Sequence, residues 1–78
     1  MDALRLSGIE HGGLCRIEAV EESPAKPRLQ SLGLVPGALV TPLFTASSGS
    51  PTAYSVRGAV IALRRADAER IKVTRLWD

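Results

Sequence analysis

The stretch RLQSLGLVPGALV, residues 28–40, decides how this chain folds, because it sets leucines and valines around two glycines and a proline. Pro27, just before it, suits the first position of a helix, where a missing N–H leaves no hydrogen bond unmade. Leu29 and Leu32 follow at a spacing of three and would face the core together. Gly33 then supplies the left-handed conformation that ends many helices. The stretch therefore predicts a short helix that begins at Pro27 and ends before Gly33.

The second half of the stretch predicts a turn into a strand. In a helix that ends at a glycine, the residue after the glycine contacts the residue five positions earlier, and here these are Leu34 and Leu29. Pro36 and Gly37 fit the central positions of a type II turn, because proline fixes φ and glycine accepts a positive φ. Each unusual residue thus has a role in the backbone, and no ligand is needed to explain the stretch.

Short apolar runs elsewhere predict a mainly β protein. Arg57 and Gly58 separate two short strands, so Gly58 is expected to be a turn glycine. Ala68 and Ile71 would face inward from a helical turn and from the strand after it. About five strands with one or two short helices in 78 residues are typical of a small, strongly bent barrel. The predicted strands are residues 14–20, 39–45, 53–56, 59–63 and 71–77, and the later helical turn covers residues 65–70.

Alternation also predicts which side chains of the first two strands point into the barrel. In residues 14–20 these are Cys15, Ile17 and Ala19. In residues 39–45 they are Val40, Pro42 and Phe44, so Leu39 and Leu43 are expected to face outward. Proline inside a sheet is confined to edge strands and bulges, so position 42 is expected to be one of these.

The composition restricts what the protein can do. Its formal net charge is +2 and 45% of its residues are hydrophobic, so one folded domain is expected over residues 1–78. Cys15 is the one cysteine, which suits a reducing cytosol, and with the one histidine, His11, it falls short of a structural zinc site. No apolar run approaches the ~20 residues that span a membrane, and Asp2 and Arg5 do not suit a signal peptide. A cytoplasmic protein without a metal site is expected.

Catalytic motifs are missing from the sequence. No serine or cysteine lies in an activating motif, and His11 has no flanking feature that ties it to a serine or an aspartate. Gly8, Gly12 and Gly13 lack the Lys-Ser/Thr pair of a phosphate-binding loop. We therefore expect no enzyme, no catalytic residues and no cofactor.

Arg57, Arg64 and Arg65 are the residues from which a basic strip for nucleic acid would be built. A solvated rim of the barrel is favoured instead, because Asp67 and Glu69 follow directly. Single strands also stack on aromatic side chains, and the chain has three aromatic residues. A surplus of two charges is a weak electrostatic footprint, so no nucleic-acid partner is expected.

Residues 28–73 resemble the FeoA family of bacterial ferrous iron transport. RLQSLGLVPG matches the family pattern R-L-x-x-L-G-L-x-P-G, and residues 49–51 match its G-x-P loop. RGAVIALRRADAERIKV matches R-G-x-x-I-A-L-R-x-x-x-A-x-x-I-x-V. The resemblance implies an SH3-like barrel and a role beside FeoB, the membrane GTPase permease that imports Fe(II). Departures at Pro42, in the loop before Pro51 and in residues 21–27 leave the core pattern intact.

The resemblance implies a small accessory protein that contacts the cytosolic side of the FeoB-type membrane GTPase, and that stands at the inner membrane only through the permease. Two alternatives come from other classes. A regulatory SH3-like module would associate with a metalloregulator or with nucleic acid, although a chain that starts at Met1 leaves no room for a helix-turn-helix. A metal chaperone would retain Fe(II) or Zn(II) through His11 and Cys15.

The outward leucines of residues 39–45 define the candidate contact surface. Leu39 and Leu43 are expected to join Leu34 and Val35 in an apolar patch that seats a partner. The partner would dock there as an added strand or as a helix. Self-association stays open, because small barrels with exposed edges can pair or swap strands.

Overall fold

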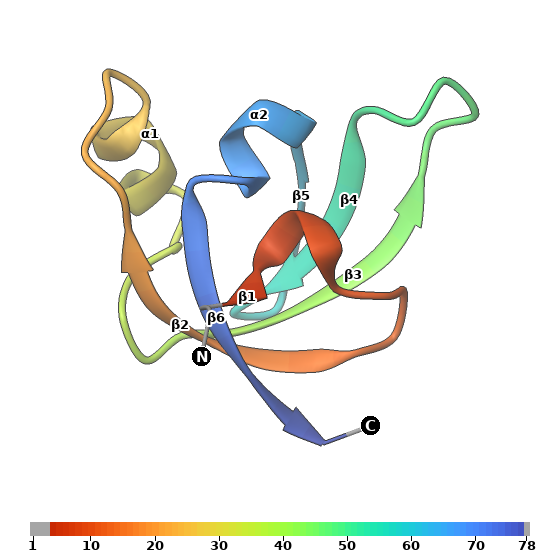
Figure 1. The fold of residues 1–78 in the computed structure, drawn as a ribbon, viewed down its shortest axis with the longest axis horizontal. Coiled ribbons are helices and arrows are strands. Elements are labelled where there is room, and N and C mark those ends of the chain that lie inside the picture. Colours follow the sequence, from red (N-terminus) through yellow and green to blue (C-terminus); the bar gives the residue numbers. More distant parts are fainter. Residues whose placement is uncertain (1–3, 78) are drawn as a thin grey trace.

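The chain is mainly β with two short helices, as the sequence predicts (Figure 1). The computed structural model describes residues 4–77. In chain order the elements are β1 (Leu4–Arg5), the 3-10 helix η1 (Leu6–Gly8), β2 (Leu14–Val20), α1 (Lys26–Ser31), β3 (Leu39–Thr45), β4 (Thr52–Val56), β5 (Ala59–Leu63), α2 (Arg65–Ala68) and β6 (Ile71–Trp77).

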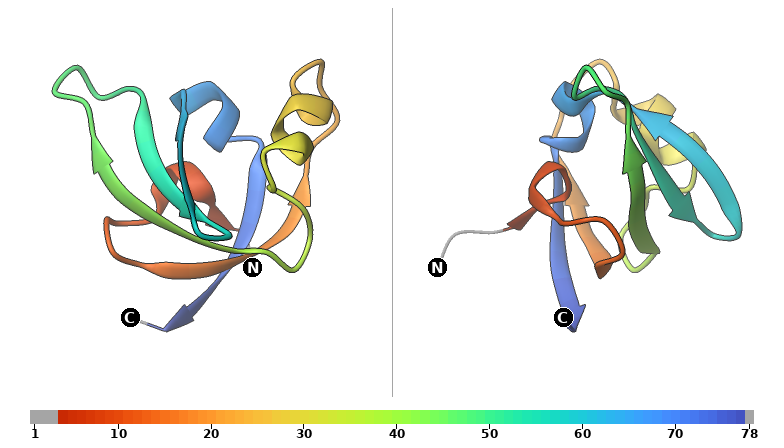
Figure 2. Two further views of the ribbon diagram at one scale, coloured as in Figure 1. Left: turned by 180° about the vertical axis from the view of Figure 1, so that it is seen from behind. Right: turned by 90° about the vertical axis from the view of Figure 1, so that its right-hand side faces the viewer.

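The strands form one antiparallel sheet with the order β1-β6-β2-β3-β4-β5. The sheet bends so strongly that β2 and β6 lie across the interior from β4 and β5, and both helices lie at one end of the barrel (Figures 1 and 2). The sheet has one strand more than the sequence predicts. This strand, β1, pairs Leu4 and Arg5 with Val73 and Lys72 of β6. Two residues are too short a run for alternation to be visible in the sequence.

The core lies inside the curve of the sheet. Each short helix contributes a side chain to it, because Leu29 of α1 is fully buried and Ala68 of α2 is 1% exposed. Ala68 and Ile71 therefore point inward, as predicted. The largest fully buried side chains are Leu6, Ile17, Leu29, Leu34, Leu63 and Ile71. These side chains come from both halves of the bent sheet and from both ends of the chain. Their burial against one another therefore holds the barrel closed.

A register shift changes which side chains of β2 are buried. Cys15 and Ile17 point into the core, as predicted. The pairing of β2 with β6 then shifts between Ile17 and Ala19, so that Val20 is buried and Ala19 is only half-buried. The prediction for Ala19 is wrong because an irregularity in the ladder resets the alternation beyond it.

A second shift corrects the prediction for Phe44. The pairing of β3 with β4 runs Pro42 to Tyr54 and then Phe44 to Ala53, which leaves Leu43 without a partner in the bulge. Val40 and Pro42 are buried as predicted, whereas the Phe44 side chain is 63% exposed. Pro42 thus stands at a bulge, and its carbonyl accepts a 2.8 Å hydrogen bond from the N–H of Gly12.

The stretch that follows α1 has the predicted backbone. The Leu34 N–H donates to the Leu29 carbonyl at 3.1 Å, and the Gly33 N–H donates to the Gln30 carbonyl at 3.0 Å. These two bonds, with φ of +99° at Gly33, are the glycine-based helix cap that the sequence indicates. Pro27 is the second residue of α1 rather than the first, because the helix already begins at Lys26.

Two turns then place β3, β4 and β5. The Ala38 N–H donates to the Val35 carbonyl at 3.0 Å, and φ is +91° at Gly37, as expected of a type II turn. Between β4 and β5 the chain reverses through Arg57 and Gly58, whose φ values are +52° and +83°. Two successive positive φ values are the signature of the tight hairpin turn whose twist matches that of the strands.

Candidate partner-binding site

A hollow of about 520 Å³ lies beside the turn that leads into β3. Val35 is half-buried at one side of it, and Leu39 is 49% exposed at the other. Arg57 reaches it from the β4–β5 hairpin. The lining residues are Val35, Pro36, Gly37, Ala38, Leu39 and Arg57, and we call this surface the turn hollow. Its lining is mostly apolar, with one cation at its margin.

The structure divides the four residues predicted for the contact patch. Val35 and Leu39 come together in the turn hollow. Leu43 is 38% exposed but lies at the bulge of β3 and does not line the hollow. Leu34 is fully buried, so its place on a surface patch is a wrong prediction. The helix cap is the reason, since it folds Leu34 back over Leu29 and into the core.

The strand chosen for docking also has to be corrected. β3 pairs with β2 on one side and with β4 on the other, so it is an interior strand of the sheet. An added strand therefore has no free edge to pair with at Leu39. A partner at the turn hollow would have to contact side chains instead.

Two backbone hydrogen bonds to β2 fix the shape of the turn hollow. The Gly37 N–H donates to the Ile17 carbonyl at 2.8 Å, and the Ile17 N–H donates to the Ala38 carbonyl at 2.9 Å. Ile17 is itself 1% exposed, so the turn is anchored to a core position. Val35 and Leu39 therefore keep a fixed spacing on the surface before any partner arrives.

Arg57 belongs to the site although its sequence context did not place it there. A Cβ built on Gly33 would lie 3.1 Å from its Cδ atom, which shows that the arginine stem runs over the end of α1. Within residues 4–77 the guanidinium has no ion pair. The long-range contact between a hairpin and a helix end gives no local pattern by which the sequence would reveal it.

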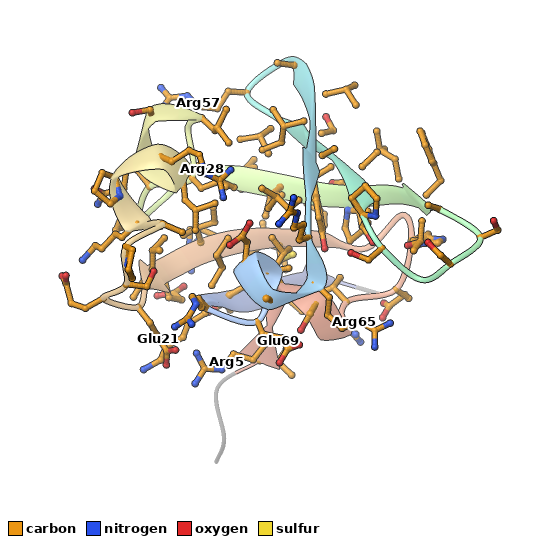
Figure 3. All side chains as sticks on the ribbon, turned by 90° about the horizontal axis from the view of Figure 1, so that it is seen from above. Arg5, Glu21, Arg28, Arg57, Arg65 and Glu69 are labelled. Atoms are coloured by element: carbon orange, nitrogen blue, oxygen red, sulfur yellow. The ribbon has the colours of Figure 1, made fainter. Side chains whose placement is uncertain are left out.

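Arg28 holds the two helices in position on the same side of the molecule as Arg57 (Figure 3). Its Nη2 atom lies 2.9 Å from Oδ2 of Asp67, which joins α1 to α2. The Asp67 side chain is 15% exposed and that of Arg28 is 57% exposed. A half-exposed ion pair of this kind contributes less than about 1 kcal/mol, so its main effect is to orient the helices.

The residues considered for a metal site do not face solvent together. The His11 side chain is exposed, and its Nε2 atom lies 2.8 Å from Oγ1 of Thr45. Cys15 is fully buried, with its Sγ atom 3.4 Å from the Val40 carbonyl oxygen, and burial raises the pKa of its thiol. Among residues 4–77, no three His, Cys, Asp or Glu side chains are grouped so that they could hold a metal ion.

A second hollow of about 320 Å³ is lined by both polar and apolar side chains. It is lined by Ser7, Ile9, Glu10, His11, Thr45, Thr52 and Tyr54. Thr45 and Thr52 share a 2.8 Å hydrogen bond, and the Tyr54 side chain is 2% exposed. Burial raises the pKa of Tyr54, and a hydrogen bond with Thr52 opposes this in part. The hydroxyls are thus largely occupied with one another.

None of the helices within residues 4–77 has the length and apolar character needed to cross a membrane.

The strongly bent antiparallel sheet, with short helices at one end, defines a protein of the SH3-like class of small barrels. The family follows from a comparison of the sequence with family models. The FeoA domain model matches residues 4–75, so the chain belongs to the FeoA family. Members of this family are accessory proteins of ferrous iron transport and are not enzymes. A comparison with curated proteins gave no match.

Solved structures of similar proteins agree with this assignment. The FeoA protein of Chlorobium tepidum is 35% identical, with a TM-score of 0.87 over 95% of this chain and 71% of that one. Iron(II) transport protein A of Clostridium thermocellum is 28% identical, with a TM-score of 0.89 over 94% and 46% of the two chains. FeoA of Stenotrophomonas maltophilia, an SH3 domain protein solved with zinc, is 27% identical, with a TM-score of 0.82 over 92% and 91%.

Proposed function

We propose that this protein is a cytosolic accessory factor that binds the cytosolic part of a FeoB-type membrane GTPase. It acts by protein–protein contact and alters the assembly or gating of the permease without chemistry of its own. The observation that carries the proposal is the turn hollow, an exposed apolar surface on a member of the FeoA family. The Stenotrophomonas maltophilia relative is a candidate activating factor of ferrous iron transport, which supports an accessory role for this chain as well.

The turn hollow suits a protein partner because it is rigid before binding. Gly33 ends α1, Gly37 turns the chain, and the bonds to Ile17 hold the turn against β2. A surface that must reorganise on binding loses part of its binding free energy to that ordering. A pair of apolar side chains that is already fixed therefore gives a higher affinity than a mobile pair. Leu39, with half its surface exposed, is the residue that a partner would cover most completely.

The chemistry of the hollow indicates what would occupy it. Val35 and Leu39 offer apolar contact, and the guanidinium of Arg57, which forms no ion pair within residues 4–77, stands at the margin. A matching surface would present one or two large apolar side chains with a carboxylate beside them, which is the usual pattern of an apolar centre and a polar rim. Such a contact places the protein at the cytoplasmic face of the inner membrane through its partner.

The direct test is co-purification of the full chain with FeoB from the same organism. The cytosolic GTPase domain is tested with GTP analogue, with GDP and without nucleotide, and the whole transporter is tested in detergent. We expect a 1:1 complex in at least one of these states. The absence of binding in all of these states would overturn the proposal.

A further inference from the structure

Strand β5 ends the sheet and has one unpaired edge. It pairs with β4 along its whole length, from Thr52 opposite Leu63 to Val56 opposite Ala59. Beyond β5 the strand order holds no further strand within residues 4–77. Figure 2 shows this hairpin at the outside of the molecule, with one side of β5 facing away from the body.

The tight hairpin turn decides which backbone groups of β5 remain free. A two-residue turn makes Val56 and Ala59 a hydrogen-bonded pair, and such pairs alternate along an antiparallel ladder. Ala59, Ile61 and Leu63 therefore direct their N–H and carbonyl groups towards β4. Val60 and Ala62 direct theirs outward. Apart from the bonds within the sheet, neither residue makes a backbone hydrogen bond to another part of residues 4–77.

The devices that usually protect an edge strand are absent from the sequence AVIAL of β5. The strand contains no proline and no charged residue, and its register with β4 is continuous, without a bulge. Val60 is 65% exposed. An apolar edge left open in this way is a template for pairing with another strand.

Arginines stand at both ends of this edge. Arg57 precedes β5 and Arg64 follows it, and neither forms an ion pair within residues 4–77. Asp67 follows Arg64 closely in the sequence, but in the structure it pairs with Arg28 of α1. A hollow of about 430 Å³ opens beside the end of the strand, lined by Arg28, Ala62, Arg64, Ala66 and Asp67.

We propose that the outer edge of β5 binds an extended segment of a partner protein as an added antiparallel strand, with acidic residues at both ends of that segment. Backbone bonds to Val60 and Ala62 supply the pairing, and carboxylates meet Arg57 and Arg64. Charge argues against a second copy as the occupant. Two β5 strands paired antiparallel would bring Arg64 of each copy beside the arginine turn of the other, and like charges placed so close repel. The proposal does not depend on the identity of the permease.

The test is an NMR titration of the full ¹⁵N-labelled chain with a synthetic peptide, Glu-Glu-Thr-Val-Thr-Val-Glu-Glu, blocked at both ends. The expected result is a saturable shift of the Val60 and Ala62 amide signals, and at least tenfold slower hydrogen exchange at both. A peptide with lysine at the four glutamate positions should not bind. A peptide N-methylated at alternate residues on the pairing edge should also lose binding, because it cannot form the ladder.

Matched variants separate the backbone contribution from the charge contribution. Ala62→Pro removes a donor that β4 does not use, and should weaken binding about fivefold. Ala62→Val keeps that donor and should bind like the parent chain. Arg64→Gln should weaken binding about threefold, whereas Arg70→Gln, with the same charge change outside this edge, should not.

Three results would overturn the proposal. The first is the absence of any shift at millimolar peptide, and the second is a set of shifts that maps to the turn hollow and spares Val60 and Ala62. The third is concentration-dependent protection of these two amides without peptide, which would show that the edge pairs with a second copy. If Ala62→Pro fails to fold, the N-methylated peptide decides the backbone question on the parent chain.

Discussion

The Cδ atom of Arg57 lies 3.1 Å from the point that a Cβ at Gly33 would occupy. The end of α1 therefore lies against the β4–β5 hairpin, and the Cγ1 atom of Val56 is 3.5 Å from the same point. This approach brings Arg57 to the turn hollow and fixes one side of it. The same glycine has a positive φ, so its lack of a side chain meets two requirements at once.

Replacing Gly33 tests the close approach. Gly33→Ala should lower the free energy of unfolding by about 1–2 kcal/mol through the positive φ, and by a further increment because the new methyl group displaces the Arg57 stem. In an Arg57→Ala background the second contribution should vanish, so that the double-mutant cycle gives a coupling of about 0.5 kcal/mol. Urea unfolding of the four proteins measures it. Strict additivity would show that the two residues do not press on one another.

Leu34 and Phe44 test the corrected assignment of core and surface. Leu34→Ala should lower the free energy of unfolding by about 2–5 kcal/mol, because it leaves a cavity at a fully buried position. Phe44→Ala should change it by less than about 0.5 kcal/mol, since that ring is 63% exposed. Thermal and chemical unfolding provide the comparison. A large decrease in the free energy of unfolding for Phe44→Ala would show that the ring belongs to the core.

Stability should decline at alkaline pH. Burial raises the pKa of Cys15 above its ordinary value of 9.0 and that of Tyr54 above 10.0. Above these ordinary values the unfolded chain releases protons that the folded chain keeps, so the free energy of unfolding falls as pH rises. The contribution of Cys15 and Tyr54 to the free energy of unfolding should therefore be constant below about pH 8 and decrease above about pH 9.

Variants of the two residues identify the source of this decline. Cys15→Ala should flatten the first part of the fall, and Tyr54→Phe the later part, each compared with the parent chain at the same pH. A profile that both variants leave unchanged would assign the decline to other groups. The same burial makes the Cys15 thiol unreactive, so a thiol reagent should label it only on unfolding.

Much of the fold could be predicted because its signals are local. The cap at Gly33, the turn at Gly37 and the reversal at Gly58 depend on residues within a few positions of one another, and alternation marks strands of five to seven residues. The bulges that turn Ala19 and Phe44 out of the core could not be predicted in this way. They depend on which residue of a neighbouring strand lies opposite, and one added residue reverses every side chain beyond it.

The candidate site was predictable only in part for the same reason. Val35 and Leu39 flank a turn with a clear sequence signature, so their proximity follows from the chain itself. Arg57 joins them from a hairpin some twenty residues later in the chain, and Arg28 meets Asp67 across an even longer separation. The open edge of β5 depends on the strand order, which alternation does not determine.

We propose the turn hollow as the contact surface for the permease. This proposal is tested most directly by calorimetric titration of the FeoB GTPase domain with the parent chain, with Leu39→Asp and with Phe44→Asp. Both substitutions add one charge at an exposed apolar position, and only Leu39 lines the hollow. We expect Leu39→Asp to bind at least about tenfold more weakly at an unchanged melting temperature, and Phe44→Asp to bind like the parent chain. Equal affinity of Leu39→Asp and the parent chain would contradict this proposal.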